Sequence, residues 1–159
     1  MDTLSKEKTE LLLKLRALQT HVAQGEASLA QGLFLEPDEL ESTYQTGLYF
    51  LKRQDNEQAQ HVFGILVILE PYKLKHWREY GLSLLRNKQY QAAQYALSAA
   101  QCLEEQDMAT LAYLGETLIL LGDKSKAKTH LSTALNKIQP GNTAHVSFYQ
   151  YIQGLLKYV

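Results

Sequence analysis

The sequence predicts an all-α protein built from three helix-turn-helix repeats. Three series of residues recur with a 34-residue period and keep a fixed offset from one another: Gly47, Gly81 and Gly115; Ala59, Ala93 and Ala127; and Phe63, Leu97 and Leu131. The small residues let two antiparallel helices approach closely, and the large apolar residue fills the space beside them. Such a pair buries only one of its sides, so we expect successive pairs to stack into an α-solenoid.

The repeats are predicted at about 40–73, 74–107 and 108–141, within a domain that spans 37–141. Each repeat has a polar, turn-prone stretch between its two helices. These stretches are Arg53-Gln54-Asp55-Asn56, Arg86-Asn87-Lys88-Gln89 and Gly122-Asp123-Lys124. Pro37 stands where a first helical residue is expected, ahead of repeat one.

Two flanking segments complete the prediction. Residues 1–36 form an N-terminal helical segment, in which apolar residues recur at spacings typical of an amphipathic helix: Leu4, Leu11, Leu15, Leu18 and Val22. Residues 142–159 follow the helix stop at Pro140-Gly141, and their apolar residues predict a C-terminal capping helix on repeat three: Val146, Phe148, Tyr149, Ile152, Leu155 and Leu156.

Composition excludes several classes of function. The net charge of −1, from 16 basic and 17 acidic residues, gives no reason to expect a nucleic acid or an anionic membrane as partner. The single cysteine, Cys102, rules out an internal disulfide and favours the cytoplasm. No apolar run approaches ~18 residues and no signal peptide is recognisable, so no direct membrane insertion is expected.

The sequence contains no motif typical of an enzyme, a metal site or a cofactor-binding site. The five histidines are scattered, and no cysteine pair has zinc spacing. Gly122-Asp123-Lys124-Ser125 departs from a phosphate-binding loop, because six residues separate Gly115 from Gly122 and Asp123 precedes the lysine. Cys102 is expected to be a buried small hydrophobe among Ala99, Ala100 and Leu103.

The repeats resemble the tetratricopeptide repeat, whose pattern of Trp, Leu, Gly, Tyr, Ala, Phe and Pro appears here in parts. The matching residues are Gly47, Phe50, Ala59, Phe63 and Pro71; Trp77, Gly81, Ala93 and Ala100; and Leu111, Leu114, Gly115, Ala127 and Ala134. The resemblance implies that the first helices line a concave groove. The corresponding positions are Tyr44, Leu48, Leu51, Lys75, Arg78, Leu82, Leu85, Ala112, Glu116 and Ile119. Some of these can instead pack between helices.

Groove composition argues against one branch of this repeat family. Domains that clamp the acidic tail of heat-shock chaperones use cations and asparagine at set positions. Those positions hold Tyr44, Leu48, Glu79, Ala109 and Tyr113 here, which supply no cation. An apolar peptide held by pockets is therefore favoured.

Over about residues 29–139, the layout resembles the class II chaperones of bacterial type III secretion, which hold hydrophobic translocator proteins before export. The most specific stretches are Leu40-Glu41-x-x-Tyr44, Gly47-Leu48, Ala59-x-x-Val62-Phe63-x-x-Leu66 and Leu69-Glu70-x-Tyr72. The resemblance implies groove contacts at Tyr44, Leu48, Leu51, Phe63 and Leu69. It also implies a homodimer in which the N-terminal helix takes part, through Leu11, Leu15, Leu18 and Val22.

The function expected from the sequence is a non-enzymatic, cytoplasmic chaperone that keeps a hydrophobic translocator soluble by binding an extended segment of it. The alternative is a generic tetratricopeptide-repeat adaptor, or a chaperone for another secretion component. An adaptor would favour conspicuously charged groove positions.

Overall fold

The computed structural model describes residues 20, 28–33, 35–139 and 143–159. These residues form eight α-helices and contain no strand, which confirms the predicted all-α class. The predicted dimer contacts Leu11, Leu15, Leu18 and Val22 lie outside the described residues.

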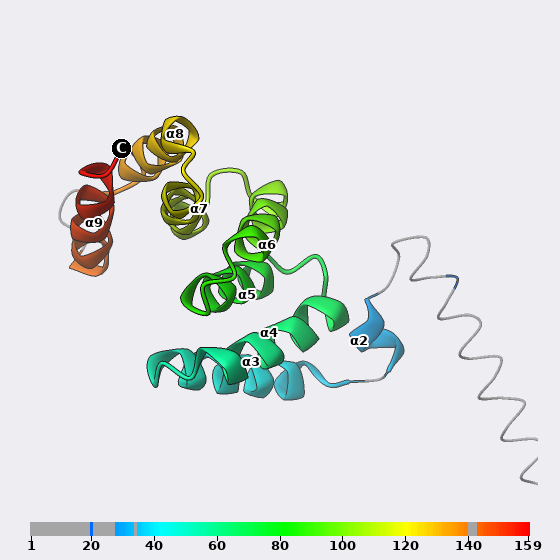
Figure 1. Cartoon of the computed structure of the whole chain (residues 1–159). Coiled ribbons are helices and arrows are strands. Elements are labelled where there is room, and N and C mark those ends of the chain that lie inside the picture. Colours follow the sequence, from blue (N-terminus) through cyan, green and yellow to red (C-terminus); the bar gives the residue numbers. More distant parts are fainter. Residues whose placement is uncertain (1–19, 21–27, 34, 140–142) are drawn as a thin grey trace, which may run out of the picture.

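Three helix pairs follow one another along the chain and stack along a curved path (Figure 1). The pairs are α3 (Pro37–Lys52) with α4 (Asn56–Leu69), α5 (Leu74–Arg86) with α6 (Tyr90–Leu103), and α7 (Met108–Leu120) with α8 (Lys124–Leu135). The short helix α2 (Leu29–Gly32) precedes them, and α9 (Thr143–Leu156) follows them.

Local capping determines where the first helices begin. Ser28 and Gln31 form a reciprocal capping box at α2, and Glu36 and Glu39 form another at α3. Pro37 is the first residue of α3, as predicted, where its missing N–H has no intrahelical partner to lose. The chain between α2 and α3 is fixed further by a hydrogen bond from the Leu35 N–H to the Ala30 carbonyl.

The recurring glycines lie where the two helices of a pair cross. A β-carbon added at Gly47, Gly81 or Gly115 would approach a partner side chain within 2.5–2.6 Å. The partners are Phe63, Leu97 and Leu131, each fully buried. The alanines of the second series, Ala59, Ala93 and Ala127, are fully buried as well. Close approach within each pair therefore depends on the absence of a side chain at the glycine.

The three turns inside the pairs share a left-handed residue at the same place in the period. Its φ is 62° at Gln54, 61° at Lys88 and 87° at Gly122. Only Gly122 adopts this conformation without a steric cost. At the other two turns, tertiary packing of the pair outweighs that cost.

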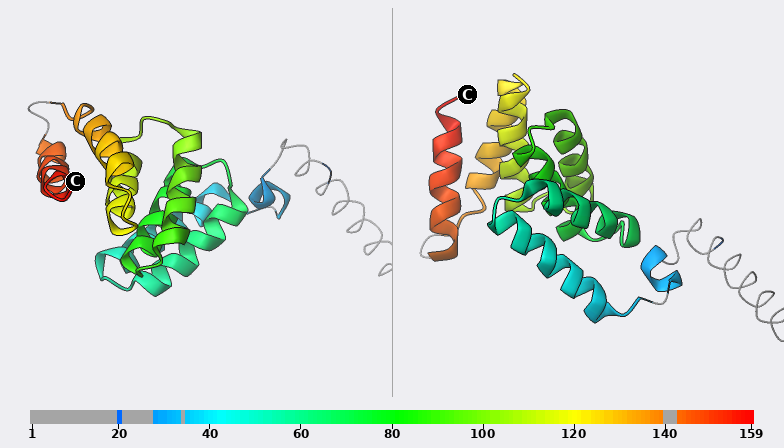
Figure 2. Two further views of the ribbon diagram at one scale, coloured as in Figure 1. Left: turned by 45° about the horizontal axis from the view of Figure 1, so that its top comes forward. Right: turned by 60° about the horizontal axis from the view of Figure 1, so that its bottom comes forward.

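The capping helix α9 packs on α7 and α8, at the end of the stack opposite α2 (Figure 2). Ile152 of α9 is fully buried in a cluster with Ala112, Leu131 and Ala134. Phe148, Tyr151, Leu155 and Leu156 surround that cluster. A continuous apolar side of α9 therefore closes the end of the solenoid.

The expectation for Cys102 is wrong. The thiol lies near the end of α6, and the residue is exposed rather than buried. Ala100, two residues earlier, takes the buried position instead. Since α6 presents Ala93, Ala96, Leu97 and Ala100 to its neighbours, Cys102 falls on the opposite side of the helix.

Candidate functional site

The first helices of the three pairs, α3, α5 and α7, are linked by ion pairs along one side of the stack, which we call the first-helix face. The Lys75 ammonium lies 2.6 Å from the Glu41 carboxylate, which joins α5 to α3. Arg86 lies 3.1 Å from Glu116, which joins α5 to α7. The equivalent helices of neighbouring repeats are therefore in register, with complementary charges across each junction.

Arg78 makes the third link. Its guanidinium contacts Glu79 at 3.0 Å on its own helix and Asp107 at 3.2 Å at the start of α7. Burial opposes the charge of Arg78, but these two carboxylates outweigh that effect and raise the pKa of Arg78. Glu79 is the more buried partner, and burial raises its pKa despite the arginine. Arg78 is therefore charged at neutral pH.

Asp107 combines this ion pair with helix capping. Its Oδ2 accepts hydrogen bonds from the Thr110 N–H at 2.8 Å and from the Thr110 hydroxyl at 2.6 Å. A carboxylate at a helix N-terminus is also favoured by the helix dipole. Removing Asp107 would therefore disturb α7 and its junction with α5 together.

Tyr44 is a core residue with one ring face turned to a cation. Its ring packs edge-on against Phe63, at 5.7 Å between centroids, and lies at the same distance from His76. The Lys75 ammonium sits 4.1 Å above the ring centroid. Burial raises the pKa of the Tyr44 hydroxyl. Only 8% of the residue is exposed, so a bound peptide could contact only a small part of the Tyr44 side chain.

At the other end of the face, α9 covers α7. The Tyr151 hydroxyl donates a hydrogen bond to Glu116, which also pairs with Arg86. Tyr113, Phe148 and Tyr151 form an aromatic cluster with centroids 5.9–6.2 Å apart. Burial raises the pKa of Tyr113 to about 12, and burial together with Glu116 raises that of Tyr151. Both phenols therefore stay neutral.

The predicted groove residues divide into an open and a covered set. Leu48, Leu51 and Leu69 are half-buried against the core between α3 and α4. Leu82 is half-buried against the core between α5 and α6. Their remaining surface is available to a ligand. Phe63, Leu85 and Ala112 are 0–3% exposed, because they fill the space between helices. These three are core residues, not groove contacts, and Ile119 packs partly against the α9 cluster.

Sequence reasoning missed Glu41, Asp107 and Tyr151 as parts of this face. Glu41 and Lys75 stand 34 residues apart, one full period, so opposite charges at equivalent positions were a readable signal. The pairing of Glu116 with Tyr151 had no such signal, because α9 lies outside the repeat.

The cations of the face do not form a carboxylate clamp. Lys75, Arg78 and Arg86 are each paired with a carboxylate of a neighbouring first helix or its cap. An incoming carboxylate would have to compete with these partners. Apolar surface at Leu48, Leu51 and Leu82 is what the face offers without displacing an existing contact.

Many solved structures match this chain, and three of them illustrate the similarity. SycD, the type III secretion translocator chaperone of Yersinia enterocolitica, is 19% identical, with a TM-score of 0.73 over 84% of this chain and 98% of its own. A type III secretion complex from Aeromonas hydrophila is 18% identical, with a TM-score of 0.77 over 89% and 93%. PcrH from Pseudomonas aeruginosa is 22% identical, with a TM-score of 0.68 over 77% and 92%.

The chain has the fold of the type III secretion translocator chaperones. The resemblance predicted from the sequence is thereby confirmed at the level of the fold. SycD has also been solved with a peptide of the translocator YopD, at a TM-score of 0.69 and 20% identity. PcrH has been solved with the chaperone-binding regions of PopD and PopB, at TM-scores of 0.69 and 0.68 and 22% identity. No protein-family model and no curated protein matches the sequence.

Two further observations concern the described part of the chain. None of its helices combines the length and apolar content that a membrane span requires. Its His, Cys, Asp and Glu side chains form no group of three or more placed to hold a metal ion.

Proposed function

We propose that this chain is a bacterial cytoplasmic chaperone, without enzymatic activity, for a hydrophobic translocator protein of a type III secretion system. The observation that carries the proposal is the fold shared with SycD and PcrH. Both match over more than three-quarters of this chain, and both have been solved with translocator peptides.

The first-helix face is the binding surface in this proposal. Its half-buried leucines, Leu48, Leu51 and Leu82, offer apolar area from α3 and α5, while its cations are already paired. An extended client segment would bury alternate side chains there, at ~25 cal/mol per Å² of apolar surface. The cover of α9 over Ala112 favours a segment bound mainly by α3 and α5.

Holding a client this way needs no chemical step. Membrane-active segments of a translocator would aggregate or insert too early if they stayed exposed. Because the client orders on binding, the affinity per unit of buried area is modest, which suits a partner that must later be released.

Co-expression tests the chaperone role directly. A translocator from the same cell is produced alone and together with this chain, and its soluble fraction is measured. The proposal expects a soluble complex only with the chain present. A translocator that stays equally insoluble in both cases would contradict it.

We also propose that the N-terminal segment forms a homodimer through Leu11, Leu15, Leu18 and Val22. These residues form an apolar stripe in the sequence. SycD, which shares the fold, crystallises as a dimer in more than one arrangement. Deleting residues 1–24 should shift the hydrodynamic size toward a monomer. An unchanged size would contradict the dimer and favour packing of the stripe on the repeats.

A second candidate is an adaptor that joins subunits of a larger assembly, or a chaperone for another secretion component. The charged positions Lys75, Arg78, Arg86 and Glu116 on the first-helix face favour it. The two functions differ in salt dependence. An adaptor bound through charges would lose affinity as ionic strength rises, whereas apolar client binding would be little affected.

A further inference from the structure

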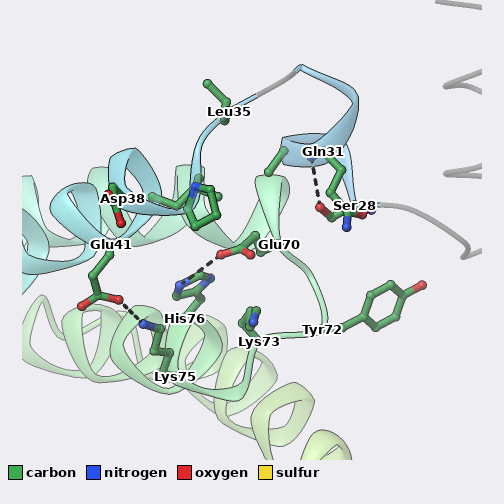
Figure 3. A pocket seen from close by; sticks show the side chains of 13 residues that line it. Ser28, Gln31, Leu35, Asp38, Glu41, Glu70, Tyr72, Lys73, Lys75 and His76 are labelled. Carbon is green, nitrogen blue, oxygen red and sulfur yellow. Dashed lines mark hydrogen bonds and ion pairs between the residues drawn. The ribbon is translucent and has the colours of Figure 1, made fainter.

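A cavity of about 600 Å³ lies beside the first-helix face, between α2, the first turns of α3 and α5, and the loop from α4 to α5 (Figure 3). Glu41 and Lys75 belong to both the cavity and the face. One wall is apolar and consists of Ala30, Leu35, Pro37 and Leu40. The volume is within the ~300–1,000 Å³ range of small-ligand sites.

The carboxylates of the cavity are not fully compensated. Glu41 is neutralised by Lys75 at 2.6 Å. The Glu70 carboxylate has only 19% of its side chain exposed, and its one ionic neighbour among the described residues is His76 Nε2, at 3.8 Å. Asp38 forms no ion pair within the described part of the chain. Glu70 is therefore a sheltered charge with no close cation.

His76 does not supply that cation. The residue is 1% exposed, and burial lowers its pKa, so the ring is neutral at pH 7 although Glu70 acts in the opposite direction. The carbonyls of Glu70 and Leu66 lie near the ring, yet Nδ1 has no hydrogen-bond partner in the described structure. Figure 3 shows Glu70 and His76 side by side in the middle of the lining.

The remaining cation of the lining is Lys73, which is exposed and has no ion pair among the described residues. Its charge is screened by water, whereas that of Glu70 acts from a partly buried position, where electrostatic interactions are stronger. The charges of Glu41 and Lys75 cancel. The unpaired charges of the lining are two carboxylates, Asp38 and Glu70, and one ammonium, Lys73. The cavity thus favours a cation that also carries an apolar stem.

We propose that this cavity binds a lysine or arginine side chain of the client, with the alkyl stem on the wall of Leu35, Pro37 and Leu40 and the cationic head at Glu70. That the side chain comes from a client rests on the proposed chaperone function. The preference of the pocket for a basic side chain does not rest on it, because a free amino-acid derivative can measure that preference. Long basic side chains bury their methylene stems on apolar surface and keep their charge near a polar group in this manner.

The test titrates the full-length chain with N-acetyl-lysine methylamide and, as a matched neutral probe, N-acetyl-norleucine methylamide. Amide chemical shifts from two-dimensional NMR report the site of binding. The lysine derivative should shift amides around Asp38, Glu70 and Lys73, and should bind about fivefold more tightly than norleucine, the gain expected from one partly exposed ion pair. Glu70→Gln should remove that difference. Glu57→Gln, at the exposed first turn of α4, should keep it.

Three outcomes would overturn the inference. Equal binding of the two derivatives would mean that the pocket selects apolar stems only. An absence of shifts at these amides would mean that it is no ligand site. Loss of the preference in Glu57→Gln as well would indicate a general charge effect. If the lysine derivative fails while a translocator is still kept soluble on co-expression, the pocket assignment fails and the chaperone proposal stands.

Discussion

A β-carbon added to Gly47 would lie 2.6 Å from the ring of Phe63, closer than side-chain atoms approach without displacement. The ring is fully buried between α3 and α4, and Tyr44 holds it from a second side. Leu97 and Leu131 have the same relationship to Gly81 and Gly115. The spacing of each helix pair is therefore set by a contact between a bare backbone and a large side chain.

Gly81→Ala should consequently destabilise the fold. The methyl group would meet Leu97 at 2.5 Å, and overpacking of this kind costs ~1–3 kcal/mol in the free energy of unfolding, more than the helix propensity that alanine adds. Chemical denaturation measures the loss. Gly154→Ala is the matched control, because nothing lies within 4 Å of its added carbon. It should be neutral or stabilising by up to ~1 kcal/mol, and an equal loss in both variants would contradict the packing argument.

Tyr151→Phe tests how α9 is attached. The change removes the hydroxyl that donates to Glu116 and leaves the aromatic packing with Tyr113 and Phe148 in place. We expect a loss of ~1–2 kcal/mol and faster amide hydrogen exchange in α9, because a partly buried bond to a charged acceptor is lost. Exchange should be unchanged in α3 and α4. Uniform acceleration along the chain would show that α9 does not open separately.

Asp107→Ala should be more damaging than Asp123→Ala. Asp107 caps α7, holds Thr110 and pairs with the partly buried Arg78, so we expect a loss of ~1–3 kcal/mol. Asp123 caps α8 in an equivalent way, but its partner Lys126 is exposed. Urea denaturation of the two variants compares them. Equal losses would mean that capping, and not the link between α5 and α7, determines the effect.

Because His76 is buried, we expect the fold to lose stability on acidification. Because burial lowers its pKa in the fold, the unfolded chain binds a proton more readily, and the stabilisation present at neutral pH disappears as the pH falls below about 6.5. His130 acts in the same direction, and Glu79, whose pKa is raised, acts in the opposite one from pH 4.5 upward. His130 and Glu79 are both present in the His76→Gln variant, so their contributions are the same in the variant and the parent. The free energy of unfolding should therefore fall less between pH 7.5 and 5.5 in this variant than in the parent, and parallel profiles would contradict the assignment.

The fold could be predicted because its determinants repeat. Gly81 and Leu97 recur in every pair, so the sequence alone indicated which residues meet between helices. The left-handed turns were only partly predictable, since Gly122 signals one and Gln54 and Lys88 do not. At those two turns the packing of the helices imposes a backbone that the residue itself disfavours.

The site was predictable only where one repeat sufficed to define it. Leu48 and Leu51, predicted as groove residues from their position in the period, are half-buried on α3, and their contact with a client stays a prediction. Ala112 was assigned to the groove by its position in the period, but α9 buries it, and α9 is not part of the period. The cavity at Glu70 was not predicted for a similar reason, because one of its walls is formed by α2, which lies outside the repeats.

Affinity purification from the chain's own cells tests whether the first-helix face holds a translocator. The amount of translocator recovered is compared for the parent, for Leu48→Glu on α3 and for Ile65→Glu, whose side chain is exposed on α4. Circular dichroism checks that both variants stay helical. Translocator should be recovered with the parent and with Ile65→Glu and lost with Leu48→Glu. Recovery that Leu48→Glu leaves unchanged would contradict binding at this face.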